Sequence, residues 1–448
     1  MNYKNINTTI TSVAIASMAF LSVLSACSIS PTGLIGVTGG EDIASDYSAP
    51  PVQIVSGYGT SACAPLPPLP PGATVVSPGM DLHAIVAAAR TGDVIALEDG
   101  RYTRADISFT TPGVTLRSVS GNPSAVIIDG GFSAQMIVRI RASNVTIAEV
   151  TLTHAYNHLA HVTPLADNVF TDNAHFYRVR FIDGSEQFIK SNGNATGTTW
   201  TNDGLVECSD FVMSAVGRGE VRNNCYTGGI DVHGGRDWVV RNNYFEGIWC
   251  DAGVAEHAVH FWSRSRDTVV ENNLIVNCAR GVGFGLGSTP TNGGRTYSDA
   301  TPAWVELQHI GGIARNNVIW STIARYDTGI EMQRVIDARV LHNTVLSRSS
   351  TATGRYSSID YRWPNTEVEI RNNLVWRITQ RNSAAGQIEG NVEGADESWV
   401  LAVDARNFHL QATAIAAIDT GIVDPDSGVD IDAATHNNGA PDVGADER

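Results

Sequence analysis

The chain has 448 residues, a formal net charge of −16 at pH 7 and 43 glycines. It carries no basic block and no interleaving of basic with aromatic residues, so a nucleic-acid-binding function is excluded. No long apolar stretch follows the first 26 residues, so the rest of the chain is not expected to span a membrane.

The first 26 residues have the features of an export signal. Lys4 precedes the apolar run ITSVAIASMAFLSVL, which is shorter than a membrane span and leads into small residues. The ending Leu24-Ser25-Ala26-Cys27 resembles the lipobox of bacterial lipoproteins, whose cysteine is lipidated after cleavage. An ordinary signal peptide is the alternative. We expect a protein of the bacterial cell envelope, anchored by lipid on Cys27 at the outer membrane or cell surface.

Residues 27–72 contain little periodic apolar sequence and end in APLPPLPPG. Proline runs favour extended, semi-rigid chain, which predicts a tether. The folded body is then expected over residues 73–425, with a C-terminal tail over 426–448.

A short phrase recurs through the body at a spacing of roughly thirty residues, which is typical of a stacked solenoid. Its copies are YRVRFI, VECSDF, VRNNYF, VENNLI, ARNNVI, LHNTVL and IRNNLV. Short β-branched runs that end in Asn or Gly predict a parallel β-helix, whose coils pair at about 4.8 Å. The third residue of each copy is expected at a corner, where stacked asparagines form an amide ladder: Val179, Cys208, Asn242, Asn272, Asn316, Asn343 and Asn372.

Before the first coil, SPGMDLHAIVAAARTGD predicts a short amphipathic helix. Leu82, Ile85, Val86 and Ala89 fall on one face, and Ser77 is the expected N-cap. Such a helix would cover the open end of the first coil.

The opening helix, together with the strands GVTLRS and NVTIAEVTL, resembles the right-handed parallel β-helix polysaccharide lyases of the alginate lyase and chondroitinase B group. The resemblance spans roughly residues 74–192 and implies an all-β, right-handed parallel β-helix solenoid with a short N-terminal capping helix. In SEQFIKS, it implies that Lys190 is the base and Glu186 a calcium ligand. The pattern departs from the family because Ser185 and Gln187 flank Glu186.

On the next coil, Asp231 and His233 stand where the family has an arginine, and Arg236 is displaced into the turn. These departures bear on whether calcium is used, so calcium stays only a candidate cofactor.

Aligning the coils predicts two outward columns ahead of the corner, because strand side chains alternate between faces. The inward residues are Ile189, Ile230, Val259, Val282, Ile330 and Ile359. The first outward column is Lys190, Asp231, His260, Gly283, Glu331 and Asp360. The second is Asn192, His233, Trp262, Gly285, Gln333 and Arg362.

A column of titratable groups beside one bulky aromatic suits the binding of a chain-like sugar. Small residues just before the inward position are expected to lower the floor of a groove there: Gly229, Ala258, Gly281, Gly329 and Ser358. The two glycines of the coil at 283–285 are expected to leave the face bare for one turn. An ordinary solvated face is the alternative.

For a metal-free lyase, Arg280 or His257 would neutralise the uronate carboxylate, Lys190 or His233 would be the base, and Tyr226 the acid. Asp231 and His260 complete the expected catalytic set. The remaining expected substrate-binding residues are Trp262, Glu331, Gln333 and Arg362. His257 and His260 could instead share a metal, although we expect them to share the substrate.

The coil spacing predicts a Cys250–Cys278 disulfide, and Cys208–Cys225 would then close the large turn that carries Tyr226. Cys63 has no obvious partner. Buried reduced thiols are the alternative. The sequence DPDSGVDID (424–432) loosely resembles a calcium loop but lacks the closing Glu, which favours a solvated acidic turn.

Polysaccharide is therefore the expected partner of a monomeric protein, and a lyase-like enzyme acting on uronate-containing glycans the expected function. A glycoside hydrolase on the same scaffold and a non-catalytic glycan-binding or structural lipoprotein are the alternatives. The pectin hydrolase signatures Asn-Thr-Asp, Asp-Asp and Gly-His-Gly are absent in that form.

Overall fold

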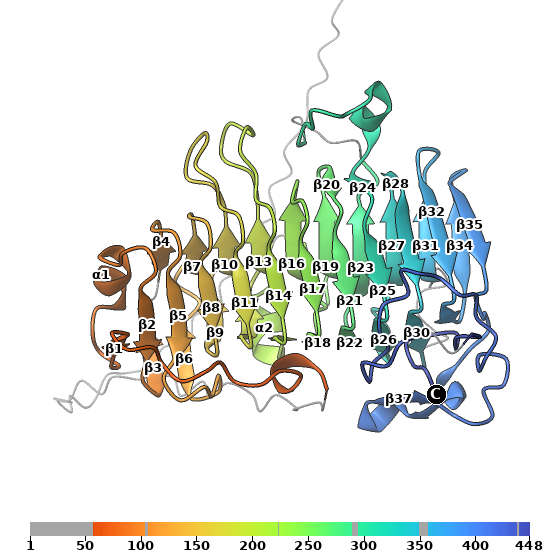
Figure 1. Cartoon of the computed structure of the whole chain (residues 1–448), viewed down its shortest axis with the longest axis horizontal. Coiled ribbons are helices and arrows are strands. Elements are labelled where there is room, and N and C mark those ends of the chain that lie inside the picture. The colour runs from red at the N-terminus through yellow and green to blue at the C-terminus, as the bar shows by residue number, and fades with distance from the viewer. Residues whose placement is uncertain (1–56, 104–105, 223, 289–293, 349–356, 437–438) are drawn as a thin grey trace, which may run out of the picture. The chain divides into compact units, whose positions relative to one another are not determined.

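The computed structural model describes residues 57–448 except 104–105, 223, 289–293, 349–356 and 437–438. The chain divides into two compact units, Met1–Ser48 and Ala49–Arg448. The first unit lies outside the described residues, as do the predicted signal and Cys27. The second unit is a parallel β-helix whose strands stack along one axis (Figure 1).

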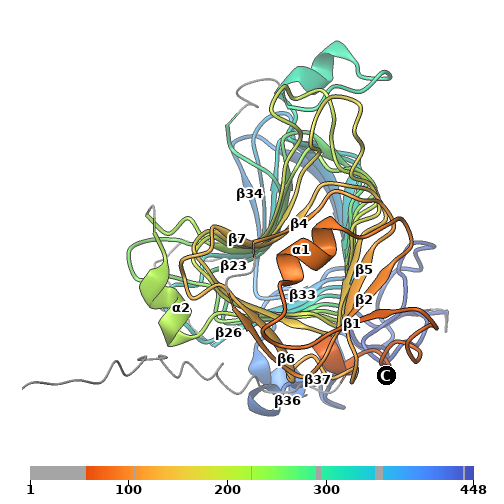
Figure 2. The same cartoon turned by 90° about the vertical axis from the view of Figure 1, so that its left-hand side faces the viewer.

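Three long parallel sheets form the walls of the coil (Figure 2). The first sheet contains twelve strands: β1 (Thr74–Val76), β2 (Val94–Leu97), β5 (Thr115–Ser118), β8 (Thr146–Ala148), β11 (His175–Tyr177), β14 (Leu205–Glu207), β17 (Val239–Arg241), β21 (Val269–Glu271), β25 (Ile313–Arg315), β29 (Ala338–Leu341), β32 (Glu367–Arg371) and β35 (Ala385–Glu389).

The second sheet contains ten strands and carries the predicted outward columns. They are β4 (Ile107–Phe109), β7 (Met136–Ile140), β10 (His158–Val162), β13 (Gln187–Ser191), β16 (Gly228–His233), β19 (His257–Trp262), β23 (Arg280–Gly285), β27 (Thr328–Gln333), β31 (Ser357–Arg362) and β34 (Ile378–Arg381).

The third sheet also contains ten strands. They are β3 (Gly100–Thr103), β6 (Val126–Asp129), β9 (Thr151–Ala155), β12 (Arg180–Gly184), β15 (Asp210–Val212), β18 (Tyr244–Glu246), β22 (Leu274–Val276), β26 (Val318–Ser321), β30 (Thr344–Ser347) and β33 (Leu374–Val375). The minor strands are β20 (Ser265–Arg266), β24 (His309–Ile310), β28 (Val335–Ile336), β36 (Val400–Ala402) and β37 (Asn407–Leu410).

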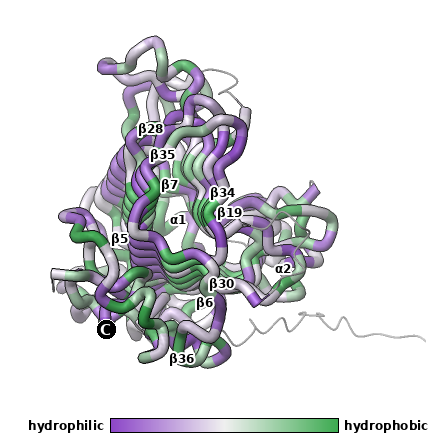
Figure 3. Tube along the Cα trace, turned by 90° about the vertical axis from the view of Figure 1, so that its right-hand side faces the viewer, coloured by the Kyte–Doolittle hydropathy of each residue, from purple (hydrophilic) through white to green (hydrophobic). Residues whose placement is uncertain are grey.

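The core lies inside the coil, where one continuous hydrophobic cluster runs from Val76 to Ala384. Hydrophobic positions form stripes along the stack in Figure 3. Aromatic rings from successive coils stack within the core. The centroid of the Phe211 ring lies 4.5 Å from that of Phe181 and 4.5 Å from that of Phe245. The predicted all-β fold is confirmed.

Helix α1 (Leu82–Ala87) lies across the N-terminal end of the coil (Figure 2) and buries Leu82 and Val86, which confirms the predicted capping helix. Its N-cap is Asp81, whose side chain accepts a hydrogen bond from the Ala84 amide. Ser77 was the wrong N-cap, because its hydroxyl donates instead to Glu98. Elsewhere the helices are short: α2 (Ala215–Glu220), η1 (Gly59–Ser61), η2 (Pro302–Glu306), η3 (Glu397–Trp399) and η4 (Val403–Ala405). No helix in the described part of the chain is both long and apolar enough to cross a membrane.

The two asparagines of the recurring Asn-Asn pair have different structural roles. The first asparagine follows a strand of the first sheet and has a left-handed backbone, with φ of 56° at Asn242 and 53° at Asn272. The second forms the ladder: the Asn273 amides donate to Asn317 Oδ1, and those of Asn317 donate to Asn343 Oδ1. The ladder was therefore predicted one residue too early in most coils.

Two corner residues were misaligned for the same reason. Strand pairing aligns Leu341 with Arg371 and Tyr177 with Glu207. The left-handed corner residues are therefore His342 and Arg178, with φ of 50° and 51°, in place of Asn343 and Val179.

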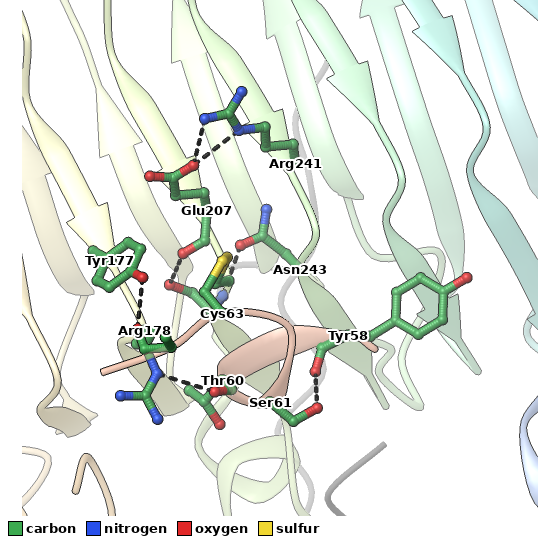
Figure 4. Close-up of a disulfide and its surroundings, with 12 residues drawn as sticks. Tyr58, Thr60, Ser61, Cys63, Tyr177, Arg178, Glu207, Arg241 and Asn243 are labelled. Atoms are coloured by element: carbon green, nitrogen blue, oxygen red, sulfur yellow. Dashed lines mark hydrogen bonds and ion pairs between the residues drawn. A yellow bond between two sulfur atoms is a disulfide. The ribbon is translucent and has the colours of Figure 1, made fainter. Parts of the chain in front are cut away.

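Residues 57–72, part of the predicted tether, lie along the flank of the β-helix (Figure 1). Arg178 Nε donates to the Thr60 carbonyl, and the Tyr177 hydroxyl donates to the Ala64 carbonyl (Figure 4). Glu149 Oε1 accepts from the Leu66 amide. Residues 57–72 therefore pack against the β-helix.

The predicted disulfides are wrong in their pairing. The structure joins Cys63 to Cys208 and Cys225 to Cys250, and leaves Cys278 as a buried free thiol. The reason is that the N-terminal segment folds back onto the first sheet and brings Cys63 to Cys208 (Figure 4).

The C-terminal residues cover the outer face of the third sheet. Phe408, Leu410 and Val443 join a second hydrophobic cluster with Tyr244 and Trp320. In the acidic turn, Asp424 and Asp426 pair with Arg339. These arginine pairs show that the acidic turn is a structural contact with the first sheet.

We predict that Asn317→Ala lowers the free energy of unfolding by about 2–4 kcal/mol, because it leaves several buried donors and acceptors unpaired. Denaturant titration of the full-length protein measures this. The matched control is Asn157→Ala, which removes an exposed amide pair with Gln135 and should cost less than about 0.5 kcal/mol. Equal losses for the two variants would contradict a stabilising ladder.

Peptide mapping without reduction should recover linked peptides that contain Cys63 with Cys208 and Cys225 with Cys250. Under denaturing conditions, an alkylating reagent should modify Cys278. A linked Cys208–Cys225 peptide would contradict the structure.

Candidate functional site

The wall that carries the site is the outer face of the second sheet. Register partners along it follow the sequence Lys190, Asp231, His260, Gly283, Glu331 and Asp360. His233 pairs with Trp262, Gly285 with Gln333, and Gln333 with Arg362. The first predicted column is therefore present in the predicted order, and so are the parts of the second column that these pairs cover.

Lys190 is the centre of the first cluster. Its ammonium forms an ion pair with Asp231, donates to His233 Nε2 at 2.7 Å and lies 3.2 Å from the Tyr226 hydroxyl. Tyr226 comes from the turn ahead of β16, whereas Asp231 and His233 are on β16 itself. Lys190 and Asp231 are only 5% and 4% exposed, so this charge pair is screened little by solvent.

Burial and the Lys190–Asp231 ion pair together set the protonation states of this cluster. Burial alone would lower the pKa of Lys190, but Asp231 and Tyr226 outweigh it and raise that pKa above its ordinary value. Burial would raise the pKa of Asp231, but Lys190 and His233 hold it well below its usual range. Burial lowers the pKa of His233 more than Asp231 raises it. At neutral pH Lys190 is therefore charged and His233 is neutral.

Trp262 closes one side of this cluster. Its indole Nε1 donates to Asp231 Oδ1 at 2.7 Å, and its ring lies 4.1 Å from the His233 ring and 5.8 Å from the His260 ring, measured between centroids. Asp231 thus holds an ammonium and an indole at once, which fixes the orientation of the aromatic ring.

A second cluster begins with His257 on β19, the strand that also carries Trp262, and extends to Glu331 on β27 and to β31. His257 Nε2 lies 3.0 Å from Glu331 Oε2, and Arg362 pairs with both Glu331 and Asp360 at 2.6 Å. Burial would raise the pKa of Glu331, but His257, Arg280 and Arg362 outweigh it and lower that pKa far below its ordinary value.

Gly283 makes this second cluster possible. A Cβ on Gly283 would lie 2.6 Å from His257 Nε2, so the imidazole occupies the space above the glycine. The face was predicted to be bare at this coil, and that is wrong: the His257 side chain crosses it to reach Glu331.

The remaining predicted residues lie at the edges of the two clusters. Arg280 pairs with Asp327 at 2.9 Å, and Gln333 Oε1 accepts from Trp363 Nε1 at 3.0 Å. The side chains of His233, Arg280 and Arg362 are 20%, 24% and 23% exposed, so solvent reaches both clusters.

The small residues ahead of the inward position do not lower the floor of a groove. Cβ atoms built on Gly229, Gly281 and Gly329 would point at Phe245, Ile319 and Val345, which are core side chains. Ala258 is itself part of the core cluster, as is the adjacent Val259. Two consecutive residues face inward here, which breaks the alternation on which the prediction depended.

The Glu186 carboxylate lies 3.6 Å from His158 Nε2. Its role as a calcium ligand stays a prediction of the family resemblance.

Two signals of the site were missed in the sequence. Of the thirty lysines and arginines, only Lys4 and Lys190 are lysines, so the wall uses an amine where the rest of the body uses guanidinium groups. The other is Glu256, which directly precedes His257 in AEHAVH and lies 3.8 Å from His260 Nδ1.

No family model matches the sequence, and no curated protein matches it. Among solved structures, pectate lyase Pel9A is similar with a TM-score of 0.52 and 15% identity, over 84% of this chain and 96% of that one. An alginate lyase from Paenibacillus sp. str. FPU-7 has a TM-score of 0.47 and 13% identity, over 72% and 99% of the two chains. The tailspike protein of E. coli bacteriophage HK620, in complex with a pentasaccharide, has a TM-score of 0.44 and 12% identity, over 72% and 64%. The chain is a right-handed parallel β-helix protein, as its sequence predicts.

We predict that the Lys190 amine keeps its proton at pH values above the ordinary pKa of a lysine. Asp231→Asn should lower the pKa of Lys190, because burial then acts without the opposing carboxylate. Lysine labelled with carbon-13 at the ε position reports this in an NMR titration, and Lys190→Arg assigns the signal. Asp299→Asn, which removes an exposed partner of Arg266, is the control and should leave the titration unchanged. An unchanged titration in Asp231→Asn would contradict the coupling.

Proposed function

We propose that this protein cleaves a uronate-containing polysaccharide by β-elimination on the outer wall of the second sheet. The observation that carries the proposal is the convergence of three groups: the Lys190 ammonium, the neutral His233 imidazole and the Tyr226 hydroxyl. Elimination from a uronate needs a cation for the carboxylate, a base for the α-proton and an acid for the leaving oxygen. The three groups supply one of each.

Lys190 serves best as the cation. Its raised pKa keeps the amine protonated, so it has no lone pair with which to accept a proton. This favours the alternative in which the ammonium binds the uronate carboxylate over the role of base that the family resemblance implies.

His233 is then the base. Its Nε2 accepts a hydrogen bond from Lys190, and its lowered pKa keeps it neutral. A substrate carboxylate that draws the ammonium toward itself would release the Nε2 lone pair for the α-proton. The Tyr226 hydroxyl, 3.2 Å from the same ammonium, would protonate the leaving oxygen.

The wall offers less support for hydrolysis. A glycosidase needs one carboxyl group with a raised pKa to act as acid. Asp231 and Glu331 both have lowered pKa values, and Asp360 is held by Arg362 and Arg381. Asp231 and Glu331 therefore carry no proton to donate at neutral pH.

The similarity in fold to pectate lyase Pel9A is consistent with this use of the scaffold. The lipobox-like sequence supports a lipid anchor on Cys27 at the cell envelope, with the β-helix as a monomeric body that meets polymeric glycans.

Full-length protein incubated with alginate, polygalacturonate and chondroitin should generate the ultraviolet absorbance of an unsaturated uronate on one of them. We expect Lys190→Ala and His233→Ala to lower that rate at least about 100-fold. His83→Ala, which changes an exposed histidine on α1, should leave it unchanged.

New reducing ends without that absorbance would replace the proposal with hydrolysis. Binding without any product would replace it with a glycan-binding role.

A further inference from the structure

We propose that Glu256, His257 and His260 form a binding site for a divalent transition metal such as Zn²⁺. One nitrogen of each imidazole and one carboxylate oxygen lie within 4.8 Å of one another. Two imidazoles and a carboxylate are a ligand set that suits zinc and its neighbours, whereas calcium and magnesium prefer oxygen ligands alone.

The hydrogen bonds of the two histidines leave one nitrogen free on each. His257 Nε2 faces the Glu331 carboxylate at 3.0 Å, and His260 Nε2 faces the Gly285 carbonyl at 2.9 Å. Both oxygens are acceptors only, so both Nε2 atoms carry the proton and the Nδ1 atoms carry the lone pairs.

His257 Nδ1 is the independent sign of a missing ligand. It is buried and has no hydrogen-bond partner, in a residue that is only 1% exposed. A buried nitrogen lone pair left unpaired costs free energy, which a metal ion at this position would recover. His260 Nδ1 lies 3.8 Å from Glu256 Oε2 and 3.8 Å from Asp231 Oδ1, too far for a hydrogen bond to either.

The outer contacts match those of metal-bound histidines elsewhere. A ligating imidazole commonly donates its other N–H to a carboxylate or a backbone carbonyl, which fixes the ring and raises its basicity. Glu331 and the Gly285 carbonyl do this for His257 and His260. Arg362 in turn holds Glu331 in place.

The local charges also allow a cation. Arg280, the register partner of His257, is paired with Asp327, and Lys190 is paired with Asp231. The Glu256 side chain is 32% exposed, so an ion can enter from solvent on that side. Three protein ligands leave a position open for water or a substrate oxygen.

The site lies two coils from Lys190 on the same wall, since Asp231 is the register partner of Lys190 and His260 that of Asp231. An ion there could bind a second acidic group or a hydroxyl pair of the same glycan. The inference stands on the geometry of these three residues and does not require the elimination chemistry proposed above.

Cobalt and zinc titrations of full-length protein test the site. We expect one Co²⁺ per chain at this site, with the visible absorbance of a low-coordinate nitrogen and oxygen environment, displaced by Zn²⁺ and not by excess Ca²⁺. Glu256→Gln, at a partly exposed position, should weaken binding at least about tenfold, and His260→Ala should abolish that absorbance. His409→Ala, in the separate group with Asp432 and Asp446, is the matched control and should preserve it.

Cobalt binding that survives both Glu256→Gln and His260→Ala, or no binding at all, would overturn the inference. Lys190→Ala should keep the metal while losing the lyase activity. The two proposals can therefore fail separately.

Discussion

The parallel register between coils is the constraint on which the rest of the structure depends. Each strand of the second sheet pairs residue for residue with the next at about 4.8 Å, so side chains far apart in sequence form columns. The buried asparagine ladder holds this register at one corner, because each Asn273-type amide can only reach the equivalent residue of the next coil. A slip of one residue would unpair the ladder and turn Lys190 and Glu331 into the core.

The register also explains how so many charges can be buried on one wall. Asp231 lies between Lys190 on the coil before and His260 on the coil after, and Glu331 reaches both His257 and Arg362. Burying an ion pair is seldom stabilising by itself, so these pairs gain little for the fold. What they provide is fixed orientation of the side chains on this wall and shifted pKa values.

The sequence was sufficient for the fold and for the columns, because both follow from periodicity and from strand alternation. It failed where the chain leaves that pattern. The corners at His342 and Arg178 carry no asparagine, and two consecutive inward residues, such as Ala258 and Val259, interrupt alternation. The disulfide of Cys63 depends on an N-terminal segment that folds back along the first sheet, and no repeat encodes that path.

The Lys190 cluster and the proposed site of Glu256, His257 and His260 lie next to the same carboxylate, Asp231. Asp231 accepts from Trp262, pairs with Lys190, and lies 3.8 Å from the His260 nitrogen that has no closer partner. Its single negative charge therefore acts on the ammonium and on the imidazole together. An arginine in place of Lys190 would spread its charge over a planar group and bind both oxygens of the Asp231 carboxylate. Neither carboxylate oxygen would then be left to face His260 alone. Lys190 is the one lysine after Lys4, and every other basic residue apart from histidine is an arginine. This is consistent with a need for an amine beside Asp231.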